Sequence, residues 1–320
     1  MKIVVLDAAT LGPGIDLTPL EAVGEVTVFD LTGPEEMAGR LAEAQVTVSN
    51  KIRLTERELA MAPNLKLVCV TATGYDTVDV RYCREHGIGV CNVPGYSTDS
   101  VAQLTLAMAL ELVTHLGAYR RFVDSGEYSR GGIANRLEPV WQELGSMTWG
   151  ILGGGNIGLR VADLARAFGC RVLVCSRSRK EGYENVDMET LFARSDIVSV
   201  HVPLNDTTRT LVGREQVNAM RKGAILINVA RGAVCDEEAL ACALEEGHLG
   251  GLGVDVFSME PFSENHPFFR LLGRENVCLT PHMAWGSQEA RNRCIFLVAE
   301  NIRHFLMGEK TNRVEGKNQF

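Results

Sequence analysis

The sequence predicts an α/β protein built from two doubly wound parallel sheets. Short, apolar, β-branched runs alternate with helical patterns in two successive series, and a glycine-rich turn joins a strand to a helix in the second series. Continuous apolar strands separated by helices are typical of a parallel sheet that is covered on both faces. The 320 residues are enough for about two domains of ~150 residues each.

The first series is expected to form one small sheet with its own helices. It ends near residue 98, where a longer helical pattern begins. The expected strands lie at 2–7, 25–30, 46–50, 65–70 and 88–93, and the expected helices at 34–44, 55–62 and 79–87.

A long helix is expected at residues 98–116, with Thr98 or Asp99 as its N-cap. Between Val101 and Val113 the pattern is apolar nearly all the way round. A helix of this kind must be buried on several sides, so it joins either two domains or two subunits.

The second series matches a complete dinucleotide-binding domain. Doubly wound domains that bind dinucleotides have six such strands with helices between them. An amphipathic helix at 287–308 closes the chain and is long enough to return to the first unit. The six expected strands lie at 148–155, 171–176, 196–202, 224–230, 252–257 and 277–282.

The glycine turn has the pattern G-x-G-x-x-G between a strand and a helix. Gly153 permits the tight turn, Gly155 lets a pyrophosphate approach the backbone, and Gly158 lets the helix pack closely on the strand. Free N–H groups at the start of the helix, with the positive end of its dipole, stabilise phosphates. The pattern alone is weak, but its correct flanks favour dinucleotide binding over a plain turn.

The strand that follows the glycine turn ends in Ser176-Arg177-Ser178-Arg179-Lys180. Many proteins of this fold place an acid where Ser176 stands, and that acid accepts hydrogen bonds from the adenosine ribose. Ser176 can instead donate to a 2′-phosphate, and Arg177 or Arg179 can pair with it. NADP(H) is therefore the favoured cofactor, and NAD(H), with a solvated basic loop, is the alternative.

Three polar residues follow strands of the second series: Arg231, Glu260 and His282. Each alone has a structural explanation, as a surface arginine, a helix cap or a core histidine. Ligands of doubly wound sheets bind outside the carboxyl ends of the strands, so three strand ends can converge on one cleft. Their common position beside a dinucleotide site favours a catalytic group over three unrelated structural residues.

Composition excludes several classes of function. The net charge of −8 argues against general nucleic-acid binding. No apolar run reaches the roughly 20 residues of a membrane span, and the first residues lack a signal-peptide pattern. The nine cysteines include no C-x-x-C pair, so we expect small buried hydrophobes in a reducing cytoplasm, with neither disulfides nor a metal site.

The sequence resembles the D-isomer-specific 2-hydroxyacid dehydrogenases over essentially its whole length. In the second series the resemblance rests on the motifs GGGNIG (153–158), HVPLNDTTRTLVG (201–213), INVARGAVCDEEAL (227–240), GVDVFSMEP (253–261) and TPHMAWGS (280–287). In the first series SNKIRLT (49–55), TATGYDTVD (71–79) and CNVPGYSTDSVAQ (91–103) look most like the hydroxypyruvate reductase or glycerate dehydrogenase branch.

The resemblance implies roles for the three strand-end residues. Arg231 would bind the substrate carboxylate and polarise its keto oxygen, His282 would donate the proton, and Glu260 would hydrogen-bond the histidine. The chemistry agrees, because hydride arrival at a carbonyl carbon leaves negative charge on oxygen that a nearby acid must neutralise. A carboxylate partner favours imidazolium and fixes the ring, and the planar guanidinium suits a carboxylate.

The resemblance also implies the remaining contacts. Asn50, Lys51, Thr73 and Gly74 would lie on loops that hold the substrate. Asn156 and Ile157 would contact the pyrophosphate, His201, Val202 and Pro203 would line the path from adenine to ribose, and Val229, Ala230, Asp255 and Ala284 would surround the nicotinamide. The chain departs from the family pattern at Gly154, where a larger apolar residue is common, and at SMTWG (146–150), where GKTLG is more usual.

The implied organisation is a flavodoxin-like substrate domain of residues 1–99 plus 284–320, with an inserted NAD(P)-binding Rossmann domain of residues 100–283. The cleft between them should close on the substrate and exclude water. Helix 98–116 resembles the element through which the family forms homodimers. The implied reaction is reduction of hydroxypyruvate or glyoxylate to D-glycerate or glycolate. The alternatives are a phosphoglycerate dehydrogenase and a corepressor-like protein that senses dinucleotide.

Overall fold

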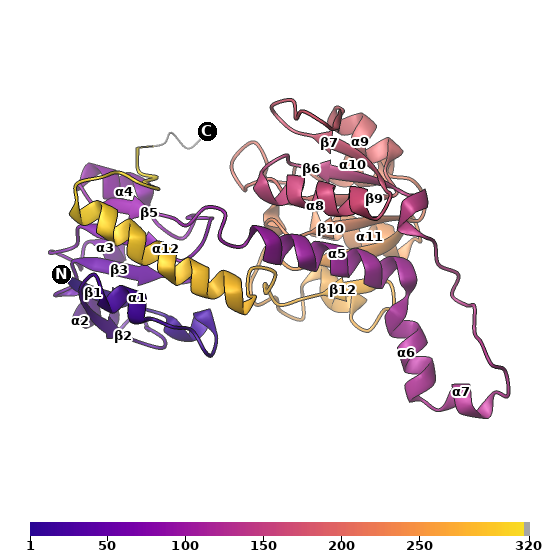
Figure 1. Cartoon of the computed structure of the whole chain (residues 1–320), viewed down its shortest axis with the longest axis horizontal. Helices are drawn as coiled ribbons and strands as arrows, with labels where there is room; N and C mark the ends of the chain where they lie inside the picture. Colours follow the sequence, from indigo (N-terminus) through magenta and orange to yellow (C-terminus); the bar gives the residue numbers. More distant parts are fainter. Residues whose placement is uncertain (317–320) are drawn as a thin grey trace. The chain divides into compact units, whose positions relative to one another are not determined.

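The computed structural model describes residues 1–316 and divides into two compact units (Figure 1). The first unit contains Met1–Ser97 and the chain from Trp285 onward, and the second contains Thr98–Ala284. The predicted α/β class with two parallel sheets is confirmed.

The first unit has a five-stranded sheet in the order β2-β1-β3-β4-β5, in which every neighbouring pair is parallel. This is the flavodoxin-like strand order. The strands β3 and β4 are buried throughout, as expected in a parallel sheet that is covered on both faces. The bounds are β1 (Lys2–Val5), β2 (Glu25–Val28), β3 (Val46–Ser49), β4 (Leu67–Val70) and β5 (Gly89–Cys91).

Helices cover both faces of this sheet and bury a separate apolar cluster on each side. The closing helix α12 (Gln288–Leu306) packs on one face with α1 (Thr18–Glu21), beside the short 3-10 turn η1 (Ala8–Leu11). Ser287 caps α12 by accepting from the Ala290 amide at 3.2 Å. The opposite face is covered by α2 (Met37–Leu41), α3 (Glu56–Leu59) and α4 (Val80–Glu85).

The second unit has a seven-stranded parallel sheet in the order β12-β11-β10-β9-β6-β7-β8. The order reverses between β6 and β9, which is where this fold binds its ligand. Six of the strands were predicted. The bounds are β6 (Thr148–Leu152), β7 (Arg171–Cys175), β8 (Glu184–Asn185), β9 (Ile197–Val200), β10 (Ala224–Asn228), β11 (Leu249–Val254) and β12 (Val277–Leu279).

The edge strand β8 was missed from the sequence because it has only two residues, both polar. Asn185 holds it in place instead of apolar packing. The side chain of Asn185 accepts from the Lys180 amide at 2.7 Å and donates to the Lys180 carbonyl at 2.8 Å. Two hydrogen bonds from the Asn185 side chain therefore fix the loop that follows β7.

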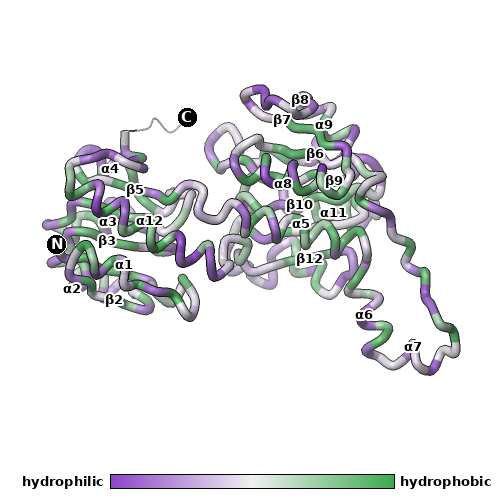
Figure 2. The backbone as a smooth tube through the Cα atoms, in the orientation of Figure 1, coloured by the Kyte–Doolittle hydropathy of each residue, from purple (hydrophilic) through white to green (hydrophobic). Residues whose placement is uncertain are grey.

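Helices also cover both faces of the second sheet (Figure 1). One face carries α5 (Thr98–Thr114) and α8 (Asn156–Ala167), which pack against each other. Figure 2 shows hydrophobic stretches along the strands between the helical layers. The other face carries α9 (Met188–Arg194), α10 (Arg214–Ala219), α11 (Glu237–Glu245) and the 3-10 turn η4 (Pro267–Leu271), while η2 (Leu144–Ser146) and η3 (Gly232–Val234) are short turns in loops.

The helix expected at 98–116 ends earlier, at Thr114, because His115 adopts a left-handed conformation with φ of 52°. Two unpredicted helices follow, α6 (Leu116–Asp124) and α7 (Glu127–Arg130). Together with the returning chain they extend away from the sheet of the second unit (Figure 1). We call residues 116–141 the arm. Ile133, Leu137 and Val140 in the arm are 70–78% exposed.

Helix α5 is buried on one side only, whereas its sequence predicted burial on several sides. Val101, Met108 and Leu112 lie in the core, while Leu104 and Leu110 on the other side are half-buried.

In the described part of the chain no single helix is long and apolar enough to cross a membrane. Helices α5 and α6 reach that length and apolarity only when taken together, and the chain bends by 64° between them.

All nine cysteines are free thiols, and six of them are buried. Burial raises the pKa of Cys83 and of Cys294 to about 12, which keeps both thiols protonated. Within residues 1–316 no group of three or more histidine, cysteine or acidic side chains is arranged to hold a metal ion.

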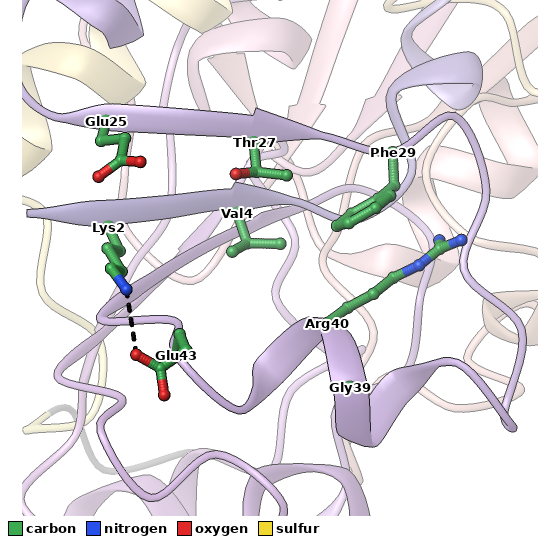
Figure 3. A pocket seen from close by; sticks show the side chains of 8 residues that line it. All are labelled: Lys2, Val4, Glu25, Thr27, Phe29, Gly39, Arg40 and Glu43. Atoms are coloured by element: carbon green, nitrogen blue, oxygen red, sulfur yellow. Dashed lines mark hydrogen bonds and ion pairs between the residues drawn. The ribbon is translucent and has the colours of Figure 1, made fainter.

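A shallow pocket in the first unit lies beside β1, β2 and α2 (Figure 3). Charged side chains of the chain itself occupy its edges. Lys2 pairs with Glu43 at 3.0 Å, and the Arg40 guanidinium lies 4.0 Å from the centre of the Phe29 ring. Its lining contains none of the site residues predicted from the sequence; the lining residues are Lys2, Val4, Glu25, Thr27, Phe29, Gly39, Arg40 and Glu43.

Candidate active site

The carboxyl ends of β10, β11 and β12 lie side by side in the second unit. Asn228 pairs in register with Val254, and Val254 with Leu279. The Asp255 amide donates to Asn228 at 3.0 Å, and the Thr280 amide donates to Val254 at 2.9 Å. The residues that follow these three strands therefore emerge at one edge of the sheet, as the sequence predicted.

His282 and Glu260 form a close pair at this edge. The Nδ1 atom of His282 lies 2.6 Å from Oε2 of Glu260, and the other carboxylate oxygen accepts from the Phe257 amide at 3.0 Å. The side chains are 21% and 32% exposed. Because the carboxylate engages Nδ1, it fixes the orientation of the His282 ring.

Asp255 holds the turn that carries His282. Its carboxylate is 1% exposed and accepts from the Thr280 hydroxyl at 2.6 Å and from the amides of Met283 and Ala284, each at 2.9 Å. His282 adopts a φ of 53°, a left-handed conformation that costs on the order of 1–3 kcal/mol for a residue other than glycine. The hydrogen bonds to Asp255 on either side of His282 offset this strain.

Burial also affects the charge of Asp255. Desolvation raises the pKa of the Asp255 carboxyl above its ordinary value, while the hydrogen bonds from Thr280, Ala284 and Met283 and the nearby His282 act in the opposite direction. In the structure these three donors occupy both carboxylate oxygens. The sequence predicted a contact of this side chain with the nicotinamide. The sequence did not predict that Asp255 also fixes the turn that carries His282.

Arg231 is positioned by Asn228, a residue that the sequence analysis missed. The buried side chain of Asn228 donates to the Arg231 carbonyl at 2.9 Å and accepts from the Ala230 amide at 3.0 Å. The next residue, Gly232, allows the backbone to approach Phe257 and Ser258, since a Cβ there would lie 2.0 Å from the Phe257 carbonyl carbon. The segments carrying Arg231 and Glu260 are thus in direct backbone contact.

The glycine loop fits a dinucleotide. Gly153 has a φ of 109°, and a Cβ on Gly158 would lie only 1.9 Å from the Gly153 carbonyl oxygen, so both must be glycine. A Cβ on Gly155 would meet no atom within 4 Å. Helix α8 begins at Asn156, followed by Ile157, without a side-chain cap. Open space in front of uncapped N–H groups is the arrangement that accepts a pyrophosphate.

Ser176 lies directly after β7, where the sequence predicted the contact with the adenosine ribose. Its hydroxyl donates to the Ser178 carbonyl at 2.6 Å, and Lys180 Nζ lies 2.9 Å from the Ser178 hydroxyl. A Cβ on Gly154 would meet Lys180 Cε at 2.8 Å and Ser176 Oγ at 3.0 Å. Gly154 therefore leaves room for Lys180 to lie over the glycine loop, whereas the expected contacts Arg177 and Arg179 are exposed.

His201, Val202 and Pro203 follow β9, and a Cβ on Gly153 would lie 2.7 Å from the His201 carbonyl carbon. The Ser199 hydroxyl accepts from the Trp149 indole and lies 2.9 Å from His201 Nε2. Burial lowers the pKa of His201 to about 3, so its ring is neutral. The structure thus brings His201 and Val202 against the glycine loop, and Pro203 follows them in the chain.

The expected nicotinamide contacts lie at the same strand ends as Asp255. Val229 and Ala284 are buried, and Ala230 is half-buried. Ser100 of α5 donates to the Ala284 carbonyl at 2.6 Å, which ties this strand end to the helix.

In the first unit the loop with Asn50 and Lys51 is held by Asp7, another residue that the sequence analysis did not include in the site. The Asp7 carboxylate is 2% exposed and accepts from the amides of Asn50, Lys51 and Ile52 at 2.7–3.2 Å. Three successive amides around one buried carboxylate fix this loop. The only signal of Asp7 in the sequence is an acid at the end of the strand expected at 2–7.

The loop with Thr73 and Gly74 is fixed by the following strand. Asn92 donates to the Thr73 carbonyl at 2.6 Å, and the Thr73 hydroxyl donates to Val93 at 3.0 Å. Asn301 of α12 in turn donates to the Asn92 carbonyl at 3.0 Å. The closing helix therefore supports the loop that the sequence assigned to the substrate.

These residues suit the reduction of a carbonyl group next to a carboxylate. The second unit combines a dinucleotide loop, a histidine paired with a carboxylate, and a nearby arginine. The histidine can move a proton, and the arginine can bind an anion in a planar, bidentate manner.

Residues 106–284 match the model of the family "D-isomer specific 2-hydroxyacid dehydrogenase, NAD binding domain". A hydroxypyruvate reductase from Blautia hydrogenotrophica is 36% identical, with 98% of this chain and 99% of that protein aligned. A glyoxylate reductase from Aeropyrum pernix is 38% identical over 89% of this chain and 88% of its own length.

Solved structures agree over nearly the whole chain. The D-lactate dehydrogenase of Aquifex aeolicus in complex with NAD and lactic acid has a TM-score of 0.87 and 29% identity, covering 99% of this chain and 100% of that one. An acyclic imino acid reductase in complex with NADPH and D-Arg has a TM-score of 0.86 and 29% identity, covering 98% and 100%.

Proposed function

The chain belongs to the D-isomer-specific 2-hydroxyacid dehydrogenase family, and we propose that it reduces hydroxypyruvate or glyoxylate to D-glycerate or glycolate. It is an oxidoreductase that uses a nicotinamide dinucleotide. The observation that carries the proposal is the 2.6 Å pair of His282 and Glu260 at the same strand ends as Arg231, in a sheet with a dinucleotide loop.

The residues of the chain divide the chemical work. The reduced nicotinamide, when bound, supplies the hydride. Arg231 binds the carboxylate of the keto acid and attracts negative charge that develops on the keto oxygen. His282 delivers a proton from Nε2 to that oxygen, and Glu260 balances the positive charge of the ring and fixes its orientation.

Residues of the first unit are proposed to contact the substrate as well. The amides of Asn50 and Lys51 donate to the buried Asp7 carboxylate, and these hydrogen bonds fix the loop. Thr73, which precedes Gly74, is held by Asn92 through its carbonyl and by Val93 through its hydroxyl. We assign the loop with Thr73 and Gly74 to the substrate carboxylate, and the loop with Asn50 and Lys51 to the substrate as a second contact.

The sequence leaves two other functions open: a phosphoglycerate dehydrogenase and a corepressor-like protein that senses dinucleotide. The names of the similar proteins favour hydroxypyruvate and glyoxylate over phosphoglycerate. A corepressor would bind dinucleotide without significant turnover, so the rate of keto-acid reduction separates these readings.

Replacing His282 by alanine tests the proposed function. The variant removes the proton donor, and we expect kcat for hydroxypyruvate reduction to fall by at least ~100-fold. His304→Ala is the matched control, because His304 also pairs with a carboxylate, that of Glu309, but lies on α12. Spectrophotometric assays of NADH and NADPH oxidation measure both variants. Wild-type turnover in His282→Ala, or no turnover of any 2-keto acid by the wild type, would contradict the proposal.

We further propose that NADP(H) is preferred over NAD(H). Ser176, and not an acid, follows β7 directly, so no carboxylate at that position repels a 2′-phosphate. Lys180 lies over Gly154, and Arg177 and Arg179 form no hydrogen bond or ion pair with residues 1–316. One charge-assisted hydrogen bond contributes roughly 1.5–3 kcal/mol, which corresponds to about ten- to hundredfold in affinity.

The cofactor preference can be reversed by single substitutions. Ser176→Asp places a negative charge beside the 2′-phosphate and should give NADH the higher kcat/KM. Arg177→Ala and Lys180→Ala should each lower kcat/KM for NADPH by about tenfold and leave that for NADH nearly unchanged. Lys222→Ala, which removes one charge at the amino end of β10, is the control. Equal effects on both cofactors would mean that the basic loop is only solvated.

We propose a homodimer formed through the second unit. The half-buried apolar side of α5 and the exposed apolar residues Ile133, Leu137 and Val140 of the arm are the surfaces that a second copy would cover. Sedimentation equilibrium should give the mass of two chains. Leu137→Asp combined with Val140→Asp should shift it toward one chain, whereas the control Leu31→Asp in the first unit should not. A wild-type monomer at all concentrations would refute this proposal.

The compartment is proposed to be the cytoplasm, because nine free thiols are typical of a reducing environment. Fractionation of cells that produce the tagged protein would test this location.

A further inference from the structure

A buried acid, Glu237, connects the segment that carries Arg231 to the segment that carries Glu260. It is the first residue of α11, six positions after Arg231, and it is 7% exposed. Its neighbour Asp236 caps the helix by accepting from the Ala239 amide at 3.0 Å, so Glu237 is not needed for capping. The family resemblance assigned no role to Glu237.

The Glu237 carboxylate accepts two hydrogen bonds from Ser258. One oxygen accepts from the Ser258 amide at 2.8 Å, and the other accepts from the Ser258 hydroxyl. Ser258 lies two residues before Glu260 and next to Phe257, whose amide donates to Glu260. Fixing Ser258 therefore fixes the turn from which Glu260 reaches His282.

His266 supplies the third donor to this carboxylate. Its Nε2 lies 2.9 Å from Glu237 Oε2, while its Nδ1 accepts from the Phe268 amide at 3.2 Å. Because Nδ1 is an acceptor, we assign the ring proton to Nε2, which donates to Glu237. The ring is 8% exposed and packs among Phe257, Phe262 and Phe268. An aromatic surround and two directed hydrogen bonds leave His266 one orientation.

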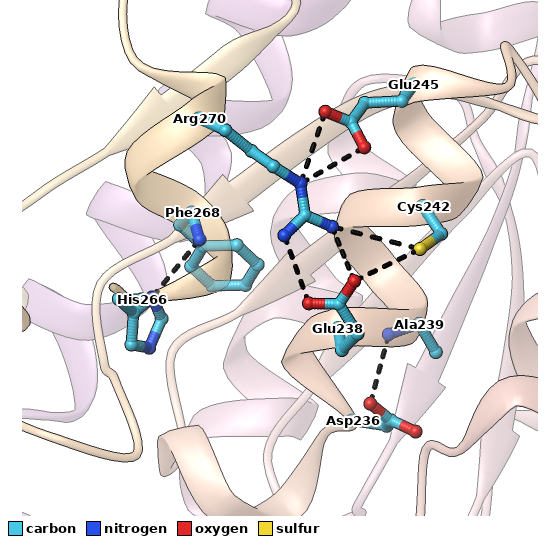
Figure 4. Close-up of polar contacts among 8 residues, drawn as sticks. All are labelled: Asp236, Glu238, Ala239, Cys242, Glu245, His266, Phe268 and Arg270. Carbon is cyan, nitrogen blue, oxygen red and sulfur yellow. Dashed lines mark hydrogen bonds and ion pairs between the residues drawn. The ribbon is translucent and has the colours of Figure 1, made fainter. Parts of the chain in front are cut away.

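A second clamp joins the same elements on their exposed side (Figure 4). Arg270 of η4 forms a bidentate pair with Glu238 at 2.7 and 3.0 Å, and its Nε lies 3.1 Å from Glu245. These contacts tie η4 to α11 but involve neither Ser258 nor Glu260. Neighbouring glutamates of α11 thus make separate contacts: Glu238 holds η4, and Glu237 holds the Glu260 turn.

We propose that Glu237, oriented by His266, is a positioning residue that sets the geometry of the Glu260–His282 pair through Ser258. The inference rests on the proposed function, since it concerns the rate of proton transfer by His282. The hydrogen bonds of the Glu237 carboxylate go to Ser258 and His266, so it acts on Glu260 and His282 through the turn. It also links this turn to the chain that follows Arg231.

A carboxylate is required because all three groups that meet it are donors. In Glu237→Gln the remaining oxygen can accept from the Ser258 amide only if the new NH₂ group faces both the Ser258 hydroxyl and His266 Nε2–H; with the amide reversed, the NH₂ group faces the Ser258 amide. The hydroxyl can rotate, whereas the ring cannot change tautomer without losing its bond to Phe268. We expect the Ser258 turn to shift, and a displacement of about 1 Å can lower turnover by up to ~100-fold.

The test is a double-mutant cycle with Glu260→Gln, measured as kcat at saturating cofactor and keto acid. Glu237→Gln alone should lower kcat by about tenfold or more. In the Glu260→Gln background the same change should have less than about a threefold effect, because the group it positions is already altered. The Kd of the reduced cofactor, measured by fluorescence titration, should stay within about twofold. Glu238→Gln is the matched control and should leave kcat unchanged.

An undiminished kcat in Glu237→Gln, or the same fold loss in both backgrounds, would overturn the proposal, because a general structural role is independent of Glu260. If Glu237→Gln does not fold, Ser258→Ala takes its place in the cycle and should lower kcat about threefold, again only when Glu260 is intact. A wild-type protein that reduces no 2-keto acid would refute the proposed function instead, since the cycle starts from an active enzyme.

Discussion

The site depends on one buried carboxylate, that of Asp255. Three donors from the segment after β12 converge on it, and they force the chain into the turn that gives His282 a positive φ. A carboxylate buried to 1% exposure needs such donors, because an unpaired charge in the interior is costly. The same three hydrogen bonds therefore satisfy the acid and hold a strained backbone that would otherwise relax.

Close backbone approaches hold the other functional segments of the second unit in place. Gly232 lies against the Phe257–Ser258 peptide, and Gly158 lies against the Gly153 carbonyl, at distances that leave no room for a Cβ. Gly232 is needed because two strand ends converge there, and Gly158 is needed because α8 packs on the phosphate loop. Asn228, Glu237 and Asp255 then fix these strand ends with hydrogen bonds. Turnover should accordingly be sensitive to residues that never contact the substrate.

The sequence was sufficient for the fold and for the placement of Arg231, Glu260 and His282, because alternating apolar strands and strand-end polar residues leave a periodic signal. It was not sufficient for the supporting network. Asp7 meets residues 50–52, and Glu237 meets Ser258 and His266, over separations of 21 to 45 residues that no local pattern records. The short strand β8 and the arm lacked apolar periodicity. Lys180 was noticed only as a charge, since its position over Gly154 depends on packing.

The role of Asp255 can be measured most directly in Asp255→Asn at saturating NADPH and saturating keto acid. The amide group must present a donor to one of the three donors that meet the carboxylate, so the His282 turn should relax. We expect kcat to fall by about tenfold or more. Because both substrates are saturating, weaker cofactor binding cannot cause this loss. Asp187→Asn, the same change at the cap of α9, should leave kcat unaltered. A wild-type kcat in Asp255→Asn, with only a raised KM for the cofactor, would contradict the role of Asp255 in holding His282.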